Sequence, residues 1–148
     1  DASVGGKGNA GVAANVQKIK GAIGYVEYAY AKTNKLPVVL LKNHDGQFVA
    51  PDADTFAAAA TGANWAKAPG MALSLNNQPG ATSWPITTAT FILMYKEPTN
   101  PAKSKETLAF FDWAFKRGAQ MAGDLDYVPM PKAAIDYIRQ SVWTQIKN

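Results

Sequence analysis

Only a few residues of this chain have the types and spacing that catalysis would require. Asp124 and Asp126 stand two residues apart, and such a pair of carboxylates can act as general acid and general base. Their place between the end of a helix and Tyr127 is more typical of capping or turn residues. His44 is the only histidine, and no serine or carboxylate pattern points to it. We therefore interpret His44 as an exposed turn residue.

Nucleophilic catalysis has no better support, because it needs a nucleophile beside a base. No serine stands in a Gly-x-Ser-x-Gly pattern; the serines are Ser3, Ser74, Ser83, Ser104 and Ser141. The absence of cysteine excludes disulfides, thiolate metal sites and cysteine nucleophiles. The sequence has neither a His-x-x-x-His pair nor a carboxylate-rich calcium loop. We expect no enzymatic activity, no metal site and no cofactor.

The glycines at the start of the chain offer a second kind of site. Gly5, Gly6, Gly8 and Gly11 suggest a phosphate loop, since backbone N–H groups at a helix N-terminus can hold an anion. No Gly-Lys-Ser/Thr pattern accompanies them. A tight turn that leads into a helix capped by Asn9 is therefore the favoured interpretation.

Composition and charge limit the class of protein. The chain has 148 residues, 47% of them apolar and 18% charged, which is typical of one globular domain. Its formal net charge is +4, but the lysines are spread from Lys7 to Lys147 without a dense run. This pattern favours a scattered, solvated surface over a nucleic-acid or membrane-surface site. No run is apolar for long enough to span a membrane, and the first residues lack the pattern of a signal peptide.

The first third of the chain predicts a helix, a strand and a short helix. Val12, Val16 and Ile19 recur at helical spacing over 9–20, and Gly21 is suited to end that helix. The apolar run 21–30 predicts a buried strand, with Gly24 marking a close approach by another element. A short helix is expected over 28–33.

The rest of the chain predicts an α/β fold with a mixed sheet flanked by helices. Strands are expected over 36–41, over 48–49 after an Asp-Gly turn, and over 86–95, the last covered on both faces. Asp52 should open a helix that ends at Gly62, with Phe56 facing the core. Residues 65–83 are expected to form a long loop. Two more helices are expected over 103–122, closed by Gly123, and over 132–147.

Three separated blocks also carry a resemblance. They are Gly6-Lys-Gly-Asn-Ala-Gly-Val12 with Gly21-Ala-Ile-Gly-Tyr-Val-Glu-Tyr-Ala-Tyr-Ala31; Trp84-Pro-Ile-Thr-Thr-Ala-Thr-Phe-Ile-Leu-Met94; and Phe110-Phe-Asp-Trp-Ala-Phe-Lys116 running on to Asp124-Leu-Asp-Tyr127. In this order they resemble the periplasmic phosphate-binding proteins of bacterial high-affinity phosphate ABC importers. The blocks span nearly the whole chain but only the C-terminal half of that family.

This resemblance implies an incomplete clamshell of the periplasmic-binding-protein type II, with part of each lobe present. Residues 1–87 would complete the second lobe and residues 88–148 would return to the first, with the hinge crossing near 86–91. The implied partners are inorganic phosphate, the permease subunits of the importer, and either the missing N-terminal half or a second copy bound through exposed strand edges. The implied location is the periplasm. The resemblance also implies that the chain begins in mid-protein, which would explain why its first residues lack the pattern of a signal peptide.

The same resemblance implies that the phosphate ligands lie outside the chain. In the family they are neutral donors, an arginine and an aspartate, and they include a Ser-Gly-Thr loop at a helix N-terminus. This sequence has no Ser-Gly-Thr, and its only arginines, Arg117 and Arg139, fall outside those motifs. No phosphate-binding residue is therefore expected here. A binder of anionic surfaces or nucleic acid, or an adhesive module on the same scaffold, remains the alternative function, although no nucleic-acid partner is expected.

Overall fold

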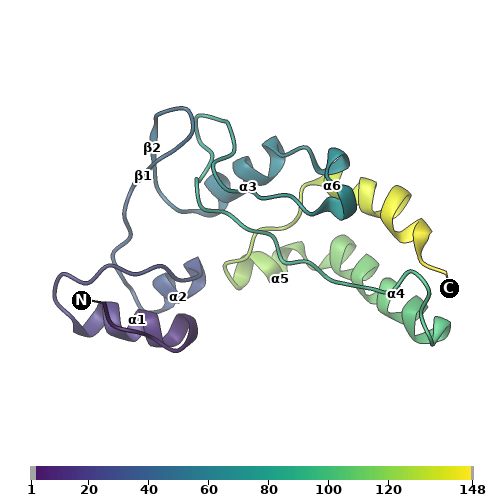
Figure 1. The fold of residues 1–148 in the computed structure, drawn as a ribbon, viewed down its shortest axis with the longest axis horizontal. Helices are drawn as coiled ribbons and strands as arrows, with labels where there is room; N and C mark the ends of the chain where they lie inside the picture. The colour runs from purple at the N-terminus through teal and green to yellow at the C-terminus, as the bar shows by residue number, and fades with distance from the viewer. Residues whose placement is uncertain (1–2, 148) are drawn as a thin grey trace.

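The computed structural model describes residues 3–147 as helices joined by long extended segments, with one small hairpin (Figure 1). The α-helices in this range are α1 (Gly8–Lys18), α2 (Tyr28–Thr33), α3 (Ala53–Gly62), α4 (Pro101–Arg117), α5 (Ala119–Asp124) and α6 (Lys132–Tyr137). The shorter helical turns are η1 (Trp65–Lys67), η2 (Pro69–Met71), η3 (Ile138–Val142) and η4 (Trp143–Gln145). Strands β1 (Leu41–Lys42) and β2 (Phe48–Val49) pair antiparallel, with Leu41 opposite Val49.

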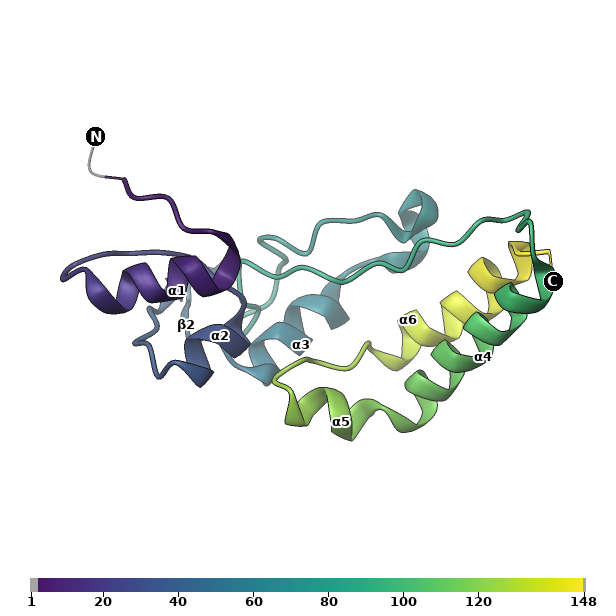
Figure 2. The ribbon, with the colours of Figure 1, turned by 90° about the horizontal axis from the view of Figure 1, so that it is seen from below.

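The molecule is elongated. Helices α1 and α2 and the hairpin lie at one end, while α4, α6 and the C-terminus lie toward the other (Figures 1 and 2). The extended segment 86–95 runs between these two ends and leads into α4. Two groups of helices are thus joined by extended chain rather than arranged on a common sheet.

The first helix is confirmed, but its cap is not the expected one. The cap position is Lys7, which makes no side-chain capping hydrogen bond, so the prediction of Asn9 was wrong. Gly8, with a φ of 64°, turns the chain into the helix one residue early, and Asn9 lies within the first turn. The Asn9 side chain is used elsewhere: its Oδ1 accepts a hydrogen bond from the Glu27 backbone N–H (3.0 Å). The helix ends at Lys18 with Ile19 as its C-cap, before the predicted stop at Gly21, and Gly21, with a φ of 80°, turns the chain afterwards.

Gly24 packs against α1, which confirms the predicted close approach. A Cβ atom at Gly24 would lie 2.8 Å from Val12 Cγ1 and 2.8 Å from Val16 Cγ2. Both distances are well below van der Waals contact, and a valine methyl group cannot swing away as a long side chain can. The absence of a side chain therefore lets segment 22–27 lie on the valine face of α1.

Gly24→Ala is expected to destabilise the chain by about 1–3 kcal/mol, the range for forcing an extra carbon into a packed contact. Urea unfolding followed by circular dichroism measures this change. Gly5→Ala is the matched control, because a Cβ at Gly5 meets no atom within 4 Å. We expect that control to stay within about 0.5 kcal/mol of the parent chain, and an equal loss in both variants would contradict the packing argument.

The hairpin and α3 follow their local signals. Gly46, with a φ of 82°, turns the chain between β1 and β2. Asp52 caps α3 through a reciprocal capping box with Thr55: Asp52 Oδ1 accepts from the Thr55 backbone (2.8 Å), and Thr55 Oγ1 accepts from the Asp52 backbone (3.0 Å). Phe56 meets Tyr28 and Trp84 edge-to-face, with ring centroids 5.4 Å and 6.3 Å away. Phe56 thus anchors α3 as expected.

The predicted long strands are not formed. Within residues 3–147, the only strands are β1 and β2, so the predictions of hydrogen-bonded strands over 21–30, 36–41 and 86–95 were wrong except at Leu41. A strand needs a neighbouring strand to satisfy its backbone, and none of the described residues lies in position to serve as one. Residues 28–30 belong to α2 instead.

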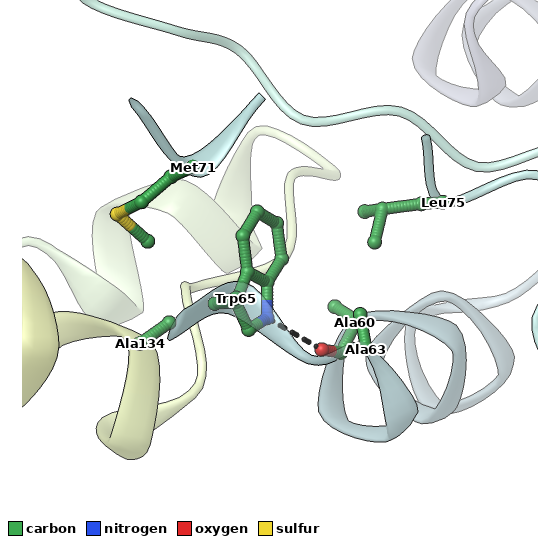
Figure 3. Packing of buried hydrophobic residues seen from close by; sticks show 6 residues of the cluster. All are labelled: Ala60, Ala63, Trp65, Met71, Leu75 and Ala134. Carbon is green, nitrogen blue, oxygen red and sulfur yellow. Dashed lines mark hydrogen bonds between the residues drawn. The ribbon is translucent and has the colours of Figure 1, made fainter. Parts of the chain in front are cut away.

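The core lies where a long loop was expected. Trp65, Met71 and Leu75, all from segment 65–83, are buried together with Ala60, Ala63 and Ala134 (Figure 3). The Trp65 indole Nε1 donates to the Ala60 carbonyl (2.9 Å), which joins the segment to α3. Small alanine side chains let α3 and α6 approach the indole ring. The irregular segment is therefore a packed part of the molecule.

The C-terminal helices differ from the prediction in their boundaries. The helix expected over 103–122 breaks at Gly118, the residue that ends α4 and precedes α5, and Gly123 lies inside α5. Asn100 caps α4 by accepting from the Lys103 backbone N–H (3.1 Å). The last predicted helix is confirmed over Lys132–Gln145, though it changes from α6 to a π-turn and then a 3₁₀ turn. Phe115 of α4 stacks on Trp143, with centroids 5.8 Å apart.

Candidate functional site

The structure assigns the two carboxylates near the end of α5 to different contacts. Asp124 Oδ1 accepts from Gln120 Nε2 (2.8 Å), one turn earlier in the same helix. The Asp126 carboxylate forms an ion pair with Lys32 of α2. Asp124 thus lies at the end of a helix and Asp126 in the following turn, as predicted from the sequence, and their carboxylates have separate partners.

His44 lies exposed in the hairpin turn, as predicted. Its Nδ1 atom is 2.8 Å from Asp45 Oδ1, and Asp45 Oδ2 accepts from the Gly80 backbone N–H (3.2 Å). The hydrogen bond from His44, followed by the one from Gly80, lowers the pKa of the Asp45 carboxyl below its usual value. The contacts of His44 and Asp45 therefore serve to tie the turn to segment 79–81.

The glycine-rich start folds back onto α1. A Cβ atom at Gly6 would lie 2.6 Å from the Val12 backbone nitrogen and 2.7 Å from the Gly11 carbonyl carbon. The Gly11 N–H donates to the Lys7 carbonyl (3.2 Å). These contacts agree with a tight turn that feeds a helix.

Arg139, one of the two arginines, is part of an ion-pair cluster between η3 and α4. Its Nε donates to Asp112 Oδ1 (2.8 Å), and its Nη2 lies 2.8 Å from the same oxygen. Lys116 Nζ lies 2.5 Å from Asp112 Oδ2. The hydrogen bond from Lys116 first, and that from Arg139 next, lower the pKa of the Asp112 carboxyl. Arg139 is thus engaged in joining two helices, and Arg117 lies at the exposed end of α4.

Two hollows lie beside helices in the described part of the chain. One, of about 290 Å³, lies beside Trp65 and Tyr137 and is lined mainly by alanines. The other, of about 470 Å³, lies between the C-terminal ends of α1 and α2, and its lining combines apolar residues with Lys20, Asn34 and Lys35. In the range 3–147, no three His, Asp or Glu side chains gather in a way that would hold a metal ion. No helix in the same range is both long and apolar enough to cross a membrane.

The most unusual surface consists of apolar side chains on extended chain, which we call the bare segments (22–27, 36–40 and 86–95). Ile23, Tyr25 and Leu93 are 92%, 90% and 93% exposed. Others on these segments are also exposed: Val38, Val39, Leu40, Ile86, Phe91, Ile92 and Tyr95. Single exposed apolar residues are ordinary, but runs of them on extended backbone are the template to which another strand adds. The sequence predicted buried strands here, and the structure shows extended chain that is neither paired in a sheet nor buried.

Several known proteins that are similar to this chain share one name. No model of a protein family matches it. It is 53% identical over 144 residues to the phosphate-binding protein PstS of Pasteurella multocida (strain Pm70) and 51% identical over 144 residues to that of Haemophilus influenzae. A protein of the same name from Methanocaldococcus jannaschii is 32% identical over 126 residues.

Coverage is uneven between the chain and these relatives. The first two alignments cover 97% of the chain but 42% and 43% of the relatives, and the third covers 78% of the chain and 32% of the relative. The chain therefore spans about two fifths of the length of the first two relatives. Because about half of the residues are identical over almost all of its length, the chain belongs to the family of the phosphate-binding protein PstS, as a segment of that length.

Proposed function

We propose that these residues are part of a non-catalytic solute-binding protein that captures inorganic phosphate in the periplasm and delivers it to the permease of an ABC importer. The proposal is supported by the name that the relatives carry and by the three sequence blocks that resemble that family. It is a proposal about the longer protein, because the chain spans less than half of each relative.

The phosphate ligands themselves lie outside the chain in this proposal. A phosphate site needs several N–H or hydroxyl donors that converge on one oxyanion, usually with an arginine. Arg139 is already paired with Asp112, and the hollow beside Trp65 is lined mostly by apolar groups. The sequence also has no Ser-Gly-Thr loop. The chain's contribution is to shape and support the two lobes between which phosphate is held.

The bare segments support the part of the proposal that places the chain within a longer, two-lobed protein. Extended backbone that exposes Ile23, Val39 and Leu93 is unfavourable in water unless another part of the protein covers it. We assign that role to the rest of the longer protein, whose strands would pair with 22–27 and 36–40 in one lobe and with 89–95 in the other. Residues 1–87 and 88–148 would then belong to different lobes, with the crossing near 86–91. A second copy of the chain is the alternative cover, and light scattering distinguishes the two.

Calorimetry with phosphate tests the function directly. The 148-residue chain alone is expected to give no binding heat, whereas the protein encoded by the full reading frame should bind phosphate at micromolar concentration or below. Sulfate titrated into the same samples is the control for general anion binding. Micromolar phosphate binding by the chain alone would overturn the placement of the ligands, and no binding by the longer protein would overturn the function.

A further inference from the structure

Two side-chain contacts join residues that are 94 and 100 positions apart in the sequence. Lys32 of α2 forms an ion pair with Asp126, and the Tyr127 hydroxyl donates to Glu27 Oε2 (3.3 Å). Figures 1 and 2 both place α2 beside the end of α5, where Asp126 and Tyr127 lie. Adjacent residues of one turn thus contact both ends of a single short helix.

Two backbone hydrogen bonds define the turn that presents Asp126 and Tyr127. After α5, the Tyr127 N–H donates to the Ala122 carbonyl (2.9 Å) and the Asp126 N–H to the Gly123 carbonyl (3.0 Å), the two hydrogen bonds of a Schellman motif. Asp126 has a φ of 63°, in the left-handed region where glycine is the usual residue. Aspartate tolerates this conformation at some cost in free energy relative to glycine. Unlike glycine, aspartate has a side chain that can form an ion pair, and here it pairs with Lys32.

The other side of the contact is also held in place. Glu27 is the cap residue of α2, and its backbone N–H is bound to Asn9 Oδ1 of α1 (3.0 Å). Lys32 lies in the last turn of the same helix. The hydrogen bond and charge of Asp126 raise the pKa of Lys32, and the charge of Glu27 raises the pKa of Tyr127. Both raised pKa values favour the protonated side chains, the lysine ammonium and the tyrosine hydroxyl, that these two contacts require.

We propose that Glu27, Lys32, Asp126 and Tyr127 form a latch that holds the part of the chain before segment 86–95 against the part after it. The inference rests on the proposed division into two lobes, since only then do the four residues face one another across a hinge. Contacts made in one arrangement of a hinged protein and lost in the other shift the population toward the first. The latch therefore favours the arrangement of the structure over a separated one.

Distance measurements between spin labels test the latch. The chain has no cysteine, so Lys18→Cys on α1 and Lys105→Cys on α4 supply the two label sites at exposed positions. Measurements use the protein encoded by the full reading frame, first without phosphate. Lys32→Met and Asp126→Asn should each lower the ratio of the short to the long distance roughly twofold to fivefold, the range of one exposed ion pair. The double variant should show little further change, because both substitutions remove the same contact.

Two further variants separate the latch from general effects. Lys132→Met also removes one lysine from an ion pair, but Lys132 and Asp136 lie on the same helix, so the distances should not change. Asp126→Gly suits the left-handed turn better than aspartate, so it should fold at least as well and still lose the short distance. Unchanged distances in Lys32→Met and Asp126→Gly, or an equal change in Lys132→Met, would overturn the proposal.

Measuring phosphate affinity in the same variants separates a failure of the latch from a failure of the proposed function. If the longer protein binds phosphate most tightly in the latched arrangement, the latch variants should weaken its apparent affinity by the same factor by which they shift the distances. If it binds no phosphate, the function fails, and the distances measured without ligand still decide the latch.

Discussion

Trp65→Ala is expected to cost the chain about 3–5 kcal/mol of its free energy of unfolding, the range for removing a buried aromatic side chain. Trp65 is only 6% exposed and lies among Met71, Leu75 and Ala134 (Figure 3). Its removal leaves a cavity beside small alanine side chains, which cannot move in to fill it. Because domains of this size are stable by only about 5–15 kcal/mol, the variant should be largely unfolded at modest denaturant.

Urea unfolding followed by far-ultraviolet circular dichroism measures this loss without relying on tryptophan fluorescence. Trp65→Phe separates packing from hydrogen bonding: it keeps an aromatic ring but leaves the Ala60 carbonyl without the indole donor, and should cost less than the alanine variant. Trp113→Ala is the matched surface control, since Trp113 is 46% exposed on α4. A loss at Trp113 as large as that at Trp65 would contradict the location of the core.

Asn43→Asp is expected to cost about 3–5 kcal/mol at pH 7, the range for a buried charge without a partner. Asn43 is buried, and its Nδ2 donates to the carbonyls of Gly80 (3.1 Å) and Ala81 (2.9 Å), while its Oδ1 accepts from the Gln47 N–H (2.9 Å). The substitution replaces the donating amide group by a carboxylate oxygen that faces two carbonyl oxygens. The hairpin would lose its attachment to segment 79–81.

The pH dependence of the stability of Asn43→Asp independently tests whether the loss comes from a buried charge. Burial and the facing carbonyls should raise the pKa of the new carboxyl in the folded chain above its value of about 3.9 in the unfolded chain. A raised folded pKa means that the variant is most stable below that unfolded value and loses stability as pH rises toward the folded pKa. Asn76→Asp, at an exposed position, should show neither effect. Equal stability of Asn43→Asp at pH 4 and pH 7 would contradict the assigned contacts.

Local signals in the sequence were sufficient wherever a few neighbouring residues satisfy the backbone. The helices α1 and α3, the Asp52 cap and the turn at Gly46 all depend on hydrogen bonds within a few positions. The close approach at Gly24 was also predictable, because only glycine leaves room for the valine face of α1. The exposed position of His44 in the hairpin turn was also predictable from its neighbours in the sequence.

The sequence by itself determined the family and the approximate positions of the helices, because identity and local helix propensity depend on consecutive residues. Only the tertiary structure decided that segments 36–40 and 86–95 lie without strand partners, that residues 65–83 supply the core, and that Lys32 meets Asp126. A strand, a core and a latch each depend on what a distant part of the chain places beside them. Residue type predicts which groups seek burial or a partner, but spatial arrangement decides which of them find one.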